Sequence, residues 1–435
     1  MLHRRRILFL AALIALPISA ATATCQQRLA PTDSILRISL ADALTRAEEA
    51  NLDLRVARQQ LAVAEARSVS AGAFPNPGAT VTREQLSSGG ASYDETSVTL
   101  SQPIEIGGQR GARIAVARQG AEAVRARLHA DRLRVAFAVH RAYIRAAIAE
   151  ADLLALSEAT EVFRRVEASG RARFAEGDIS RFDRSRLQIE LVRYETLLAT
   201  KSLDLADAGR ELTLLIAPDS IWVARTLRPA EPLAAIGGID QTISLDAAMA
   251  TATARADVIA ADAQVEAQRA TLSLARLERI PTPTLTAGFK NQADGFQGAV
   301  VGIALPLPLW NRNGGAIAEA DAQLAAAVAQ RDLVLARARN DIRRAWDTYR
   351  SLQELTRTLG ETLLPESAGL LETARFSYAE GEMSLIELLD AADAYRAARE
   401  SINALLGDYL TALFDLERAT GTLVDLPDST VTSFR

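Results

Sequence analysis

The hydrophobic positions follow two different periods along this chain, one typical of helices and one typical of strands. Between Gly120 and Gly170 there are 49 residues with neither Gly nor Pro, and the interval 316–359 is equally free of both. As one helix, the first interval would be roughly 74 Å long at about 1.5 Å per residue. Two apolar stripes along it predict a helix that packs on two sides, as in a wall of side-by-side helices, with His140 as a packed residue rather than a ligand. The first stripe is Leu133, Phe137, His140, Ile144, Ala147, Ala151 and Leu154, and the second is Leu128, Val135, Val139, Ala146, Leu153 and Leu156.

A period of two appears in two paired segments that predict β-hairpins. The first pair covers 79–86 and 95–102, and the second covers 284–292 and 297–305. Strands of about 9–11 residues suit the tilted strands of a membrane barrel, although any half-buried hairpin gives the same pattern. Four strands cannot close a barrel, so a membrane location would require several copies of the chain to share one wall.

The second half of the chain repeats the first. Ile38-Ser39-Leu40 returns as Ile243-Ser244-Leu245, and the segment 174–180 returns as 378–384, with offsets of 205 and 204 residues. A nearly constant offset indicates one duplicated unit, which reads helix, β-hairpin and long helical hairpin. The resulting boundaries are a signal peptide at 1–23, an N-terminal segment at 24–37, repeat 1 at 38–216 (β-hairpin 79–102, helical hairpin 112–216), a linker at 217–242, repeat 2 at 243–423 (β-hairpin 284–305, helical hairpin 316–420) and a tail at 424–435.

The N-terminus has the three parts of a secretory signal. Arg4-Arg5-Arg6 precedes an apolar run from Ile7 to Ile18, and Ala21-Thr22-Ala23 offers small residues for cleavage. No later stretch approaches the roughly 20 apolar residues of a membrane-spanning helix, so an exported chain of this kind is either soluble or inserted as strands. Cys25 is the single cysteine, which excludes an intramolecular disulfide. It lies where a lipoprotein signal places its acylated cysteine, and the alternative is a passenger residue after a conventional cleavage site.

Composition and charge exclude several function classes. The net charge of −5, with Arg and acidic residues interleaved, gives no basic footprint for nucleic acid. Aromatic residues make up only 5% of the chain, which suits long, closely packed helices more than a globular core. There are three His in all, and the sequence has no metal-ligand spacing, nucleophile motif or phosphate-binding glycine loop. We therefore expect no enzyme activity, no cofactor and no resident metal site.

The junctions between the predicted strands and helices contain the most specific motifs of the sequence. Pro at these junctions cannot continue a central strand, and Gly permits a sharp turn into the next helix. With these junctions the chain resembles the TolC-type outer-membrane efflux proteins over 38–423, in particular the branch of the heavy-metal (cobalt–zinc–cadmium) resistance systems. The sharpest pieces are Ser101-Gln102-Pro103-Ile104-Glu105-Ile106-Gly107-Gly108-Gln109-Arg110-Gly111 and Leu305-Pro306-Leu307-Pro308-Leu309-Trp310-Asn311-Arg312-Asn313-Gly314-Gly315.

The resemblance implies a mostly α fold with a small β part. The long antiparallel helices would form a periplasmic α-barrel, and the four strands of each chain would join a trimeric 12-stranded transmembrane β-barrel in outer-membrane lipid. It further implies a homotrimer that works with a periplasmic adaptor (membrane fusion protein) and an inner-membrane efflux pump of the resistance-nodulation-division type. The implied function is a passive duct, for which the metal branch favours metal cations over drugs or other small molecules.

The same resemblance gives roles to residues around the two tight turns between long helices. The turns would dock the adaptor at the periplasmic tip. The family has two acidic residues, three apart, that line the closed aperture, and a threefold axis would turn them into a ring of six carboxylates that attracts cations. From spacing alone they are also ordinary solvated acids near a helix N-terminus. The docking residues are Phe174, Glu176, Gly177, Tyr378, Glu380 and Gly381, and the aperture residues are Glu387 and Asp390, with Asp183 as the repeat equivalent of Glu387.

Two other interpretations explain parts of the sequence. A periplasmic adaptor also contains a long helical hairpin, but one hairpin inserted into β-rich domains rather than a duplicated chain. A soluble coiled-coil scaffold explains the helices and leaves the paired hairpins, with their proline borders, without a role.

Overall fold

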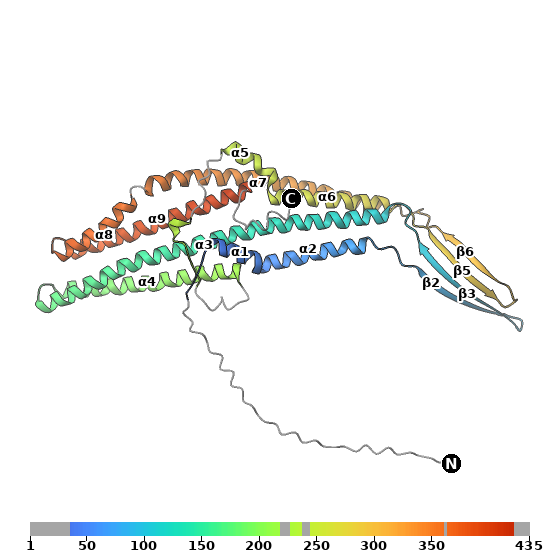
Figure 1. Ribbon diagram of the computed structural model, residues 1–435, viewed down its shortest axis with the longest axis horizontal. Helices are drawn as coiled ribbons and strands as arrows, with labels where there is room; N and C mark the ends of the chain where they lie inside the picture. Colours follow the sequence, from blue (N-terminus) through green and yellow to red (C-terminus); the bar gives the residue numbers. More distant parts are fainter. Residues whose placement is uncertain (1–34, 218–226, 237–243, 361–362, 422–435) are drawn as a thin grey trace, which may run out of the picture.

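The computed structural model describes residues 35–217, 227–236, 244–360 and 363–421. The described chain is a long rod, with a β-sheet at one end and two helical tips at the other (Figure 1). Within these ranges, no helix combines the length and the apolar character that a membrane span requires. The expected signal peptide, Cys25 and the tail at 424–435 lie outside the described residues.

The helices of repeat 1 are α1 (Leu40–Ala50), α2 (Leu52–Ala71), α3 (Gln109–Glu176) and α4 (Arg181–Ile216). Asn51 separates α1 from α2 because its backbone is extended and its side chain caps α2, while its amide donates to the carbonyl oxygen of Leu215 at 2.9 Å. The 68-residue α3 continues through both Gly120 and Gly170, past each end of the Gly-free interval. At Gly170 a Cβ would lie 2.5 Å from Leu187 Cδ1, so the missing side chain lets α4 approach closely.

Repeat 2 has the same order with more interruptions. Its helices are α5 (Leu245–Ala250), the 3-10 helix η3 (Thr251–Ala254), α6 (Ala256–Leu277), α7 (Gly314–Gly360), α8 (Leu363–Ala379) and α9 (Leu385–Thr420). α3 packs against α2, α4, α6 and α9 and is therefore the central rod of the chain. In Figure 1 α6 packs along the half of α3 nearer the sheet and α9 along the half nearer the tips.

The sheet is antiparallel throughout, in the order β2 (Gly78–Ser88), β3 (Ala91–Pro103), β5 (Thr284–Gln292) and β6 (Gln297–Ala304). The first turn is shorter than the segment 87–94 that separates the two expected strands. Gly89 and Gly90 have φ of 61° and 89°, which is the two-residue hairpin turn that matches strand twist, so pairing continues to Ser88 and Ala91. The pair of glycines explains why β2 and β3 are longer than the segments 79–86 and 95–102 that the alternating pattern predicts.

The interpretation of 217–242 as a plain linker needs correction over its described part. β4 (Leu227–Pro229) pairs in parallel with β1 (Leu36–Ile38), and the 3-10 helix η2 (Leu233–Ala235) follows it. Leu227, Leu233 and Ile236 are buried in the same core as residues of α1, α3 and α4. The segment is apolar at these positions because it packs onto the middle of the rod.

The stripes predicted along α3 are largely buried, and His140 is packed as expected. Its side chain is fully buried, its Nδ1 lies 2.8 Å from the carbonyl oxygen of Ala136, and its ring centroid is 4.2 Å from that of Phe414. Leu154 is an exception because 58% of it is exposed, so the first stripe ends one turn earlier than expected.

Candidate functional site

The first tight turn joins α3 to α4 at one tip of the rod. Gly177 has φ of 86°, and the N–H of Asp178 donates to the carbonyl oxygen of Arg173 at 2.9 Å. These two features form a Schellman-type helix end, in which Gly avoids the cost of a Cβ in the left-handed region. Phe174 lies under the guanidinium of Arg184, 4.8 Å from ring centroid to Cζ.

The second turn, from α8 to α9, repeats this geometry. Gly381 has φ of 78°, and the N–H of Glu382 donates to the carbonyl oxygen of Ser377 at 2.9 Å. Glu176 and Glu380, the acidic residues of the two turns, are both solvent-exposed. The sequence match between 174–180 and 378–384 is therefore also a match of backbone hydrogen bonds.

The two turns lie close to each other. Leu187 of α4 and Leu388 of α9 belong to one buried core that also contains residues of α3 and α8. Burial raises the pKa of Tyr378, while the charge of Arg173 lowers it and that of Asp183 raises it. The charge of Asp183, which follows the first turn, therefore acts on the side chain of Tyr378 in the second turn.

Glu387 lies in the first turn of α9, where its carboxylate has a structural partner. The backbone N–H and the hydroxyl of Ser384 donate to Glu387 Oε2 at 2.8 and 2.7 Å, and the N–H of Glu387 donates back to the hydroxyl. This is a capping box, which satisfies N–H groups that have no partner inside the helix. The hydrogen bonds from Ser384, its side chain first, hold the pKa of Glu387 below its ordinary value.

Asp390 and Asp183 differ from Glu387 in their surroundings. Asp390 is exposed one turn further along α9. Asp183 is half-buried and accepts the hydroxyl of Ser180 at 2.6 Å, as the counterpart of the Ser384 cap. All three acids lie at the tip of the rod, and Glu387 and Asp183 also belong to helix caps. Their positions are compatible both with ordinary acids near a helix N-terminus and with acids that line an aperture.

Sequence reasoning missed a set of polar ties between the two helical hairpins. The guanidinium of Arg193 lies 3.0 Å from the carboxylate of Asp393, and the hydroxyl of Tyr194 donates to Asp393 Oδ1 at 2.9 Å. Tyr395 donates to Glu158 at 2.9 Å. Burial and the Asp393 carboxylate raise the pKa of Tyr194. No sequence signal marks these pairs, since each joins residues about two hundred positions apart.

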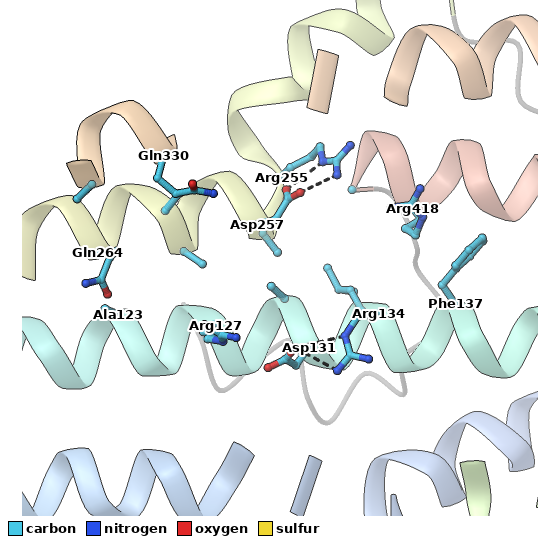
Figure 2. A pocket seen from close by; sticks show the side chains of 17 residues that line it. Ala123, Arg127, Asp131, Arg134, Phe137, Arg255, Asp257, Gln264, Gln330 and Arg418 are labelled. Atoms are coloured by element: carbon cyan, nitrogen blue, oxygen red, sulfur yellow. Dashed lines mark hydrogen bonds and ion pairs between the residues drawn. The ribbon is translucent and has the colours of Figure 1, made fainter. Parts of the chain in front are cut away.

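A cavity of about 730 Å³ lies where α3, α6 and α7 meet the end of α9 (Figure 2). Four arginines line the cavity, together with alanine residues of α3, α6 and α7. Arg255 is held by Asp257 at 2.7 Å and Arg134 by Asp131 at 3.2 Å, so these charges are engaged within the wall. Arg418 is paired with Asp415 at 2.6 Å, and Arg127 is the fourth arginine of the lining. In the part of the chain that the structure describes, no group of three or more His, Cys, Asp or Glu residues has the arrangement of a metal site.

Comparisons with known proteins fit this architecture. The cobalt-zinc-cadmium resistance protein CzcC of Cupriavidus metallidurans is 25% identical over 413 residues, covering 92% of this chain and 94% of that protein. The nickel-cobalt-cadmium resistance protein NccC of Alcaligenes xylosoxydans xylosoxydans is 30% identical over 328 residues, covering 72% of this chain and 69% of its own. The Campylobacter jejuni CmeC outer membrane channel has the same fold, with a TM-score of 0.72 at 18% identity over 88% of this chain and 85% of that one.

These comparisons confirm the expected fold class. The described chain is mostly helical with a small β part, in which long antiparallel helices continue from a four-stranded antiparallel sheet, and it shares this fold with the outer membrane channel. The resemblance to efflux proteins of the heavy-metal branch is confirmed as well. The family model for outer membrane efflux proteins matches residues 43–217 and 250–422. The chain belongs to the outer membrane efflux protein family.

Proposed function

We propose that three copies of this chain form a passive duct in the cell outer membrane, with a large periplasmic portion, through which metal cations leave the cell. The observation that carries the proposal is the single rod built from two repeats, with a two-faced sheet at one end and matching helical tips at the other (Figure 1). β2 and β6 are the edge strands of the described sheet, and pairing with sister chains would satisfy their edges.

The cargo and the partners are proposed from the relatives. Both curated relatives are named as resistance proteins for cobalt and cadmium, together with zinc or nickel. These names favour metal cations over drugs or other small molecules. Because a passive duct has no energy source of its own, we propose a periplasmic adaptor and an inner-membrane pump of the resistance-nodulation-division type as partners.

The adaptor would dock on the two turns at the tip. Each turn has a Gly-terminated helix, an aromatic residue and an exposed glutamate in equivalent positions. An adaptor that binds one turn therefore finds a second, similar surface beside it. The proposed docking residues are Phe174, Glu176, Gly177, Tyr378, Glu380 and Gly381.

The aperture is proposed to be lined by Glu387 and Asp390, with Asp183 nearby. Glu387 and Asp390 are exposed in the single chain and lie in the first two turns of α9. Three copies would bring six of these carboxylates around the axis, and such a ring attracts divalent cations. Because Glu387 also caps α9, a variant that tests the aperture has to remove the charge of Glu387 and keep the cap.

The Glu387→Gln, Asp390→Asn double variant meets this requirement, because Gln at the third helical position also completes a capping box. In planar bilayers we expect the concentration of Co²⁺, Zn²⁺ or Cd²⁺ that half-blocks the pore to rise roughly ten-fold in this variant. Single-channel current against metal concentration measures this change.

The matched control is Glu176→Gln with Glu380→Gln, which removes the same number of carboxylates from the turns. Block in this control is expected to equal that of the wild type. If the aperture variant keeps wild-type block in an intact trimer, Glu387 and Asp390 do not line the constriction. If the purified chain forms no pore at all, the proposed function is wrong.

A further inference from the structure

The two faces of the sheet have opposite chemistry. One face carries exposed apolar side chains in register across the strands, with Val98 opposite Val81 on one side and Phe289 on the other. The next residues along β2, β3 and β5 point to the other face and are mostly hydroxyl, amide or charged side chains, while those of β6 are small or apolar. In an outer-membrane barrel the apolar face meets lipid and the polar face lines the lumen. The apolar face is Val81, Val98, Leu100, Leu285, Phe289, Val301 and Ile303.

The charged residues of the lumen face gather in one layer near the hairpin turns. Glu84 is paired in register with Glu95, which is paired in turn with Gln292. The ammonium group of Lys290 lies 2.5 Å from Glu95 Oε1, and the amide of Gln292 donates to Glu95 Oε2 at 3.1 Å. Lys290 therefore neutralises one of two adjacent acids and leaves Glu84 as the uncompensated charge of the layer.

We propose that this lysine–glutamate layer sets the ion selectivity of the barrel, with Lys290 as the residue that limits its preference for cations. The inference rests on the proposed trimeric duct, since threefold symmetry would place three copies of Glu84, Glu95 and Lys290 around one lumen. The layer is far from the aperture, because it lies at the sheet end of the rod while Glu387 is at the tips (Figure 1). Selectivity then has two separate determinants.

Fixed charges act strongly at this position because the pore wall holds them beside the passing ion. Removing Lys290 would free Glu95 and roughly double the net negative charge of the layer. The effect is electrostatic, so it has to weaken as salt shortens the screening length from about 10 Å at 0.1 M to about 3 Å at 1 M. A purely structural effect of the substitution has no such salt dependence.

The experiment compares Lys290→Met with Arg83→Met in the full chain. Both variants remove one positive charge from the same end of the sheet, but Arg83 precedes Glu84 and points to the opposite face. From reversal potentials in a KCl gradient, we expect the cation-to-anion permeability ratio to rise about two-fold or more in Lys290→Met near 0.1 M salt, and much less at 1 M. Arg83→Met is expected to keep the wild-type ratio.

Glu84→Gln provides a second variant that keeps the ion pair, and it is expected to lower the permeability ratio. Equal ratios in wild type, Lys290→Met and Glu84→Gln would overturn the proposal, as would equal shifts in Lys290→Met and Arg83→Met. These outcomes leave the duct itself intact. A wild-type protein that forms no pore would instead overturn the proposed function.

Discussion

At the scale of single residues, the side chain of Glu387 at the tip has both a structural role and a proposed functional role. Glu387 completes the cap of α9 through Ser384, and its pKa is held below the ordinary value by those hydrogen bonds. A depressed carboxylate pKa stabilises the folded state above the unfolded pKa, and this contribution is lost as the pH falls through the folded pKa. The cap is therefore intact at neutral pH and weakens in acid.

Ser384→Ala is expected to loosen the start of α9, because an N-cap serine contributes about 1 kcal/mol. The amide protection factors of residues 385–388 should fall about five-fold at pH 7, which is the change that about 1 kcal/mol gives. The further loss of protection that wild type shows in acid should be smaller in the variant. Ser401→Ala, on an exposed position within α9, is the control and is expected to leave these amides unchanged. Equal protection in all three proteins would mean that the cap does not hold the tip.

At the scale of elements, the sequence predicts features that depend on neighbouring residues. It misses features that depend on contacts between distant parts of the chain. The long helices and the hairpins follow from period and punctuation, and the tip turns follow from the duplicated Gly motif. Gly120 and Gly170 do not end α3, because packing along a 68-residue helix offsets the cost of a glycine. Burial of β4 depends on Gly209, where a Cβ would lie 2.5 Å from the carbonyl oxygen of Leu227. No local pattern reveals that contact.

The candidate site divides in the same way. Glu387 and Asp390 are assigned through the family resemblance of the segment after the second turn, and their role at the aperture stays a prediction. The tie from Asp393 to Arg193 and Tyr194 depends on how two hairpins pack, so it appears only in the folded chain.

Gly209 and Gly120 give a matched test of this distinction. Gly209→Ala is expected to destabilise the protein by about 1–3 kcal/mol, because the obstacle is backbone and cannot rotate away. Gly120→Ala meets no atom within 4 Å and is expected to stabilise α3 by about 0.5–1 kcal/mol. Thermal unfolding of the purified proteins, followed by circular dichroism, should move the two midpoints in opposite directions. A Gly209→Ala protein as stable as wild type would show that β4 does not pack closely on α4.

At the scale of the whole molecule, the register of β6 against β5 decides which of its side chains would face lipid in the proposed barrel. Val301 is 84% exposed on the apolar face, and its neighbour Val300 is on the face of the charged layer. A lysine costs about 2–4 kcal/mol on the lipid face near the bilayer midplane and far less in a polar lumen. Two substitutions one residue apart are therefore expected to have different consequences for assembly.

Val301→Lys should strongly reduce the amount of trimer recovered from outer membranes, whereas Val300→Lys should assemble nearly as well as wild type. Fractionation of envelopes followed by electrophoresis in mild detergent measures both the location and the oligomer. The two variants have the same composition and the same added charge, so a difference between them reports only the direction of the side chain. Equal recovery of the two would mean that the sheet does not separate lipid from a water-filled lumen, and the barrel would have to be oriented or built in another way.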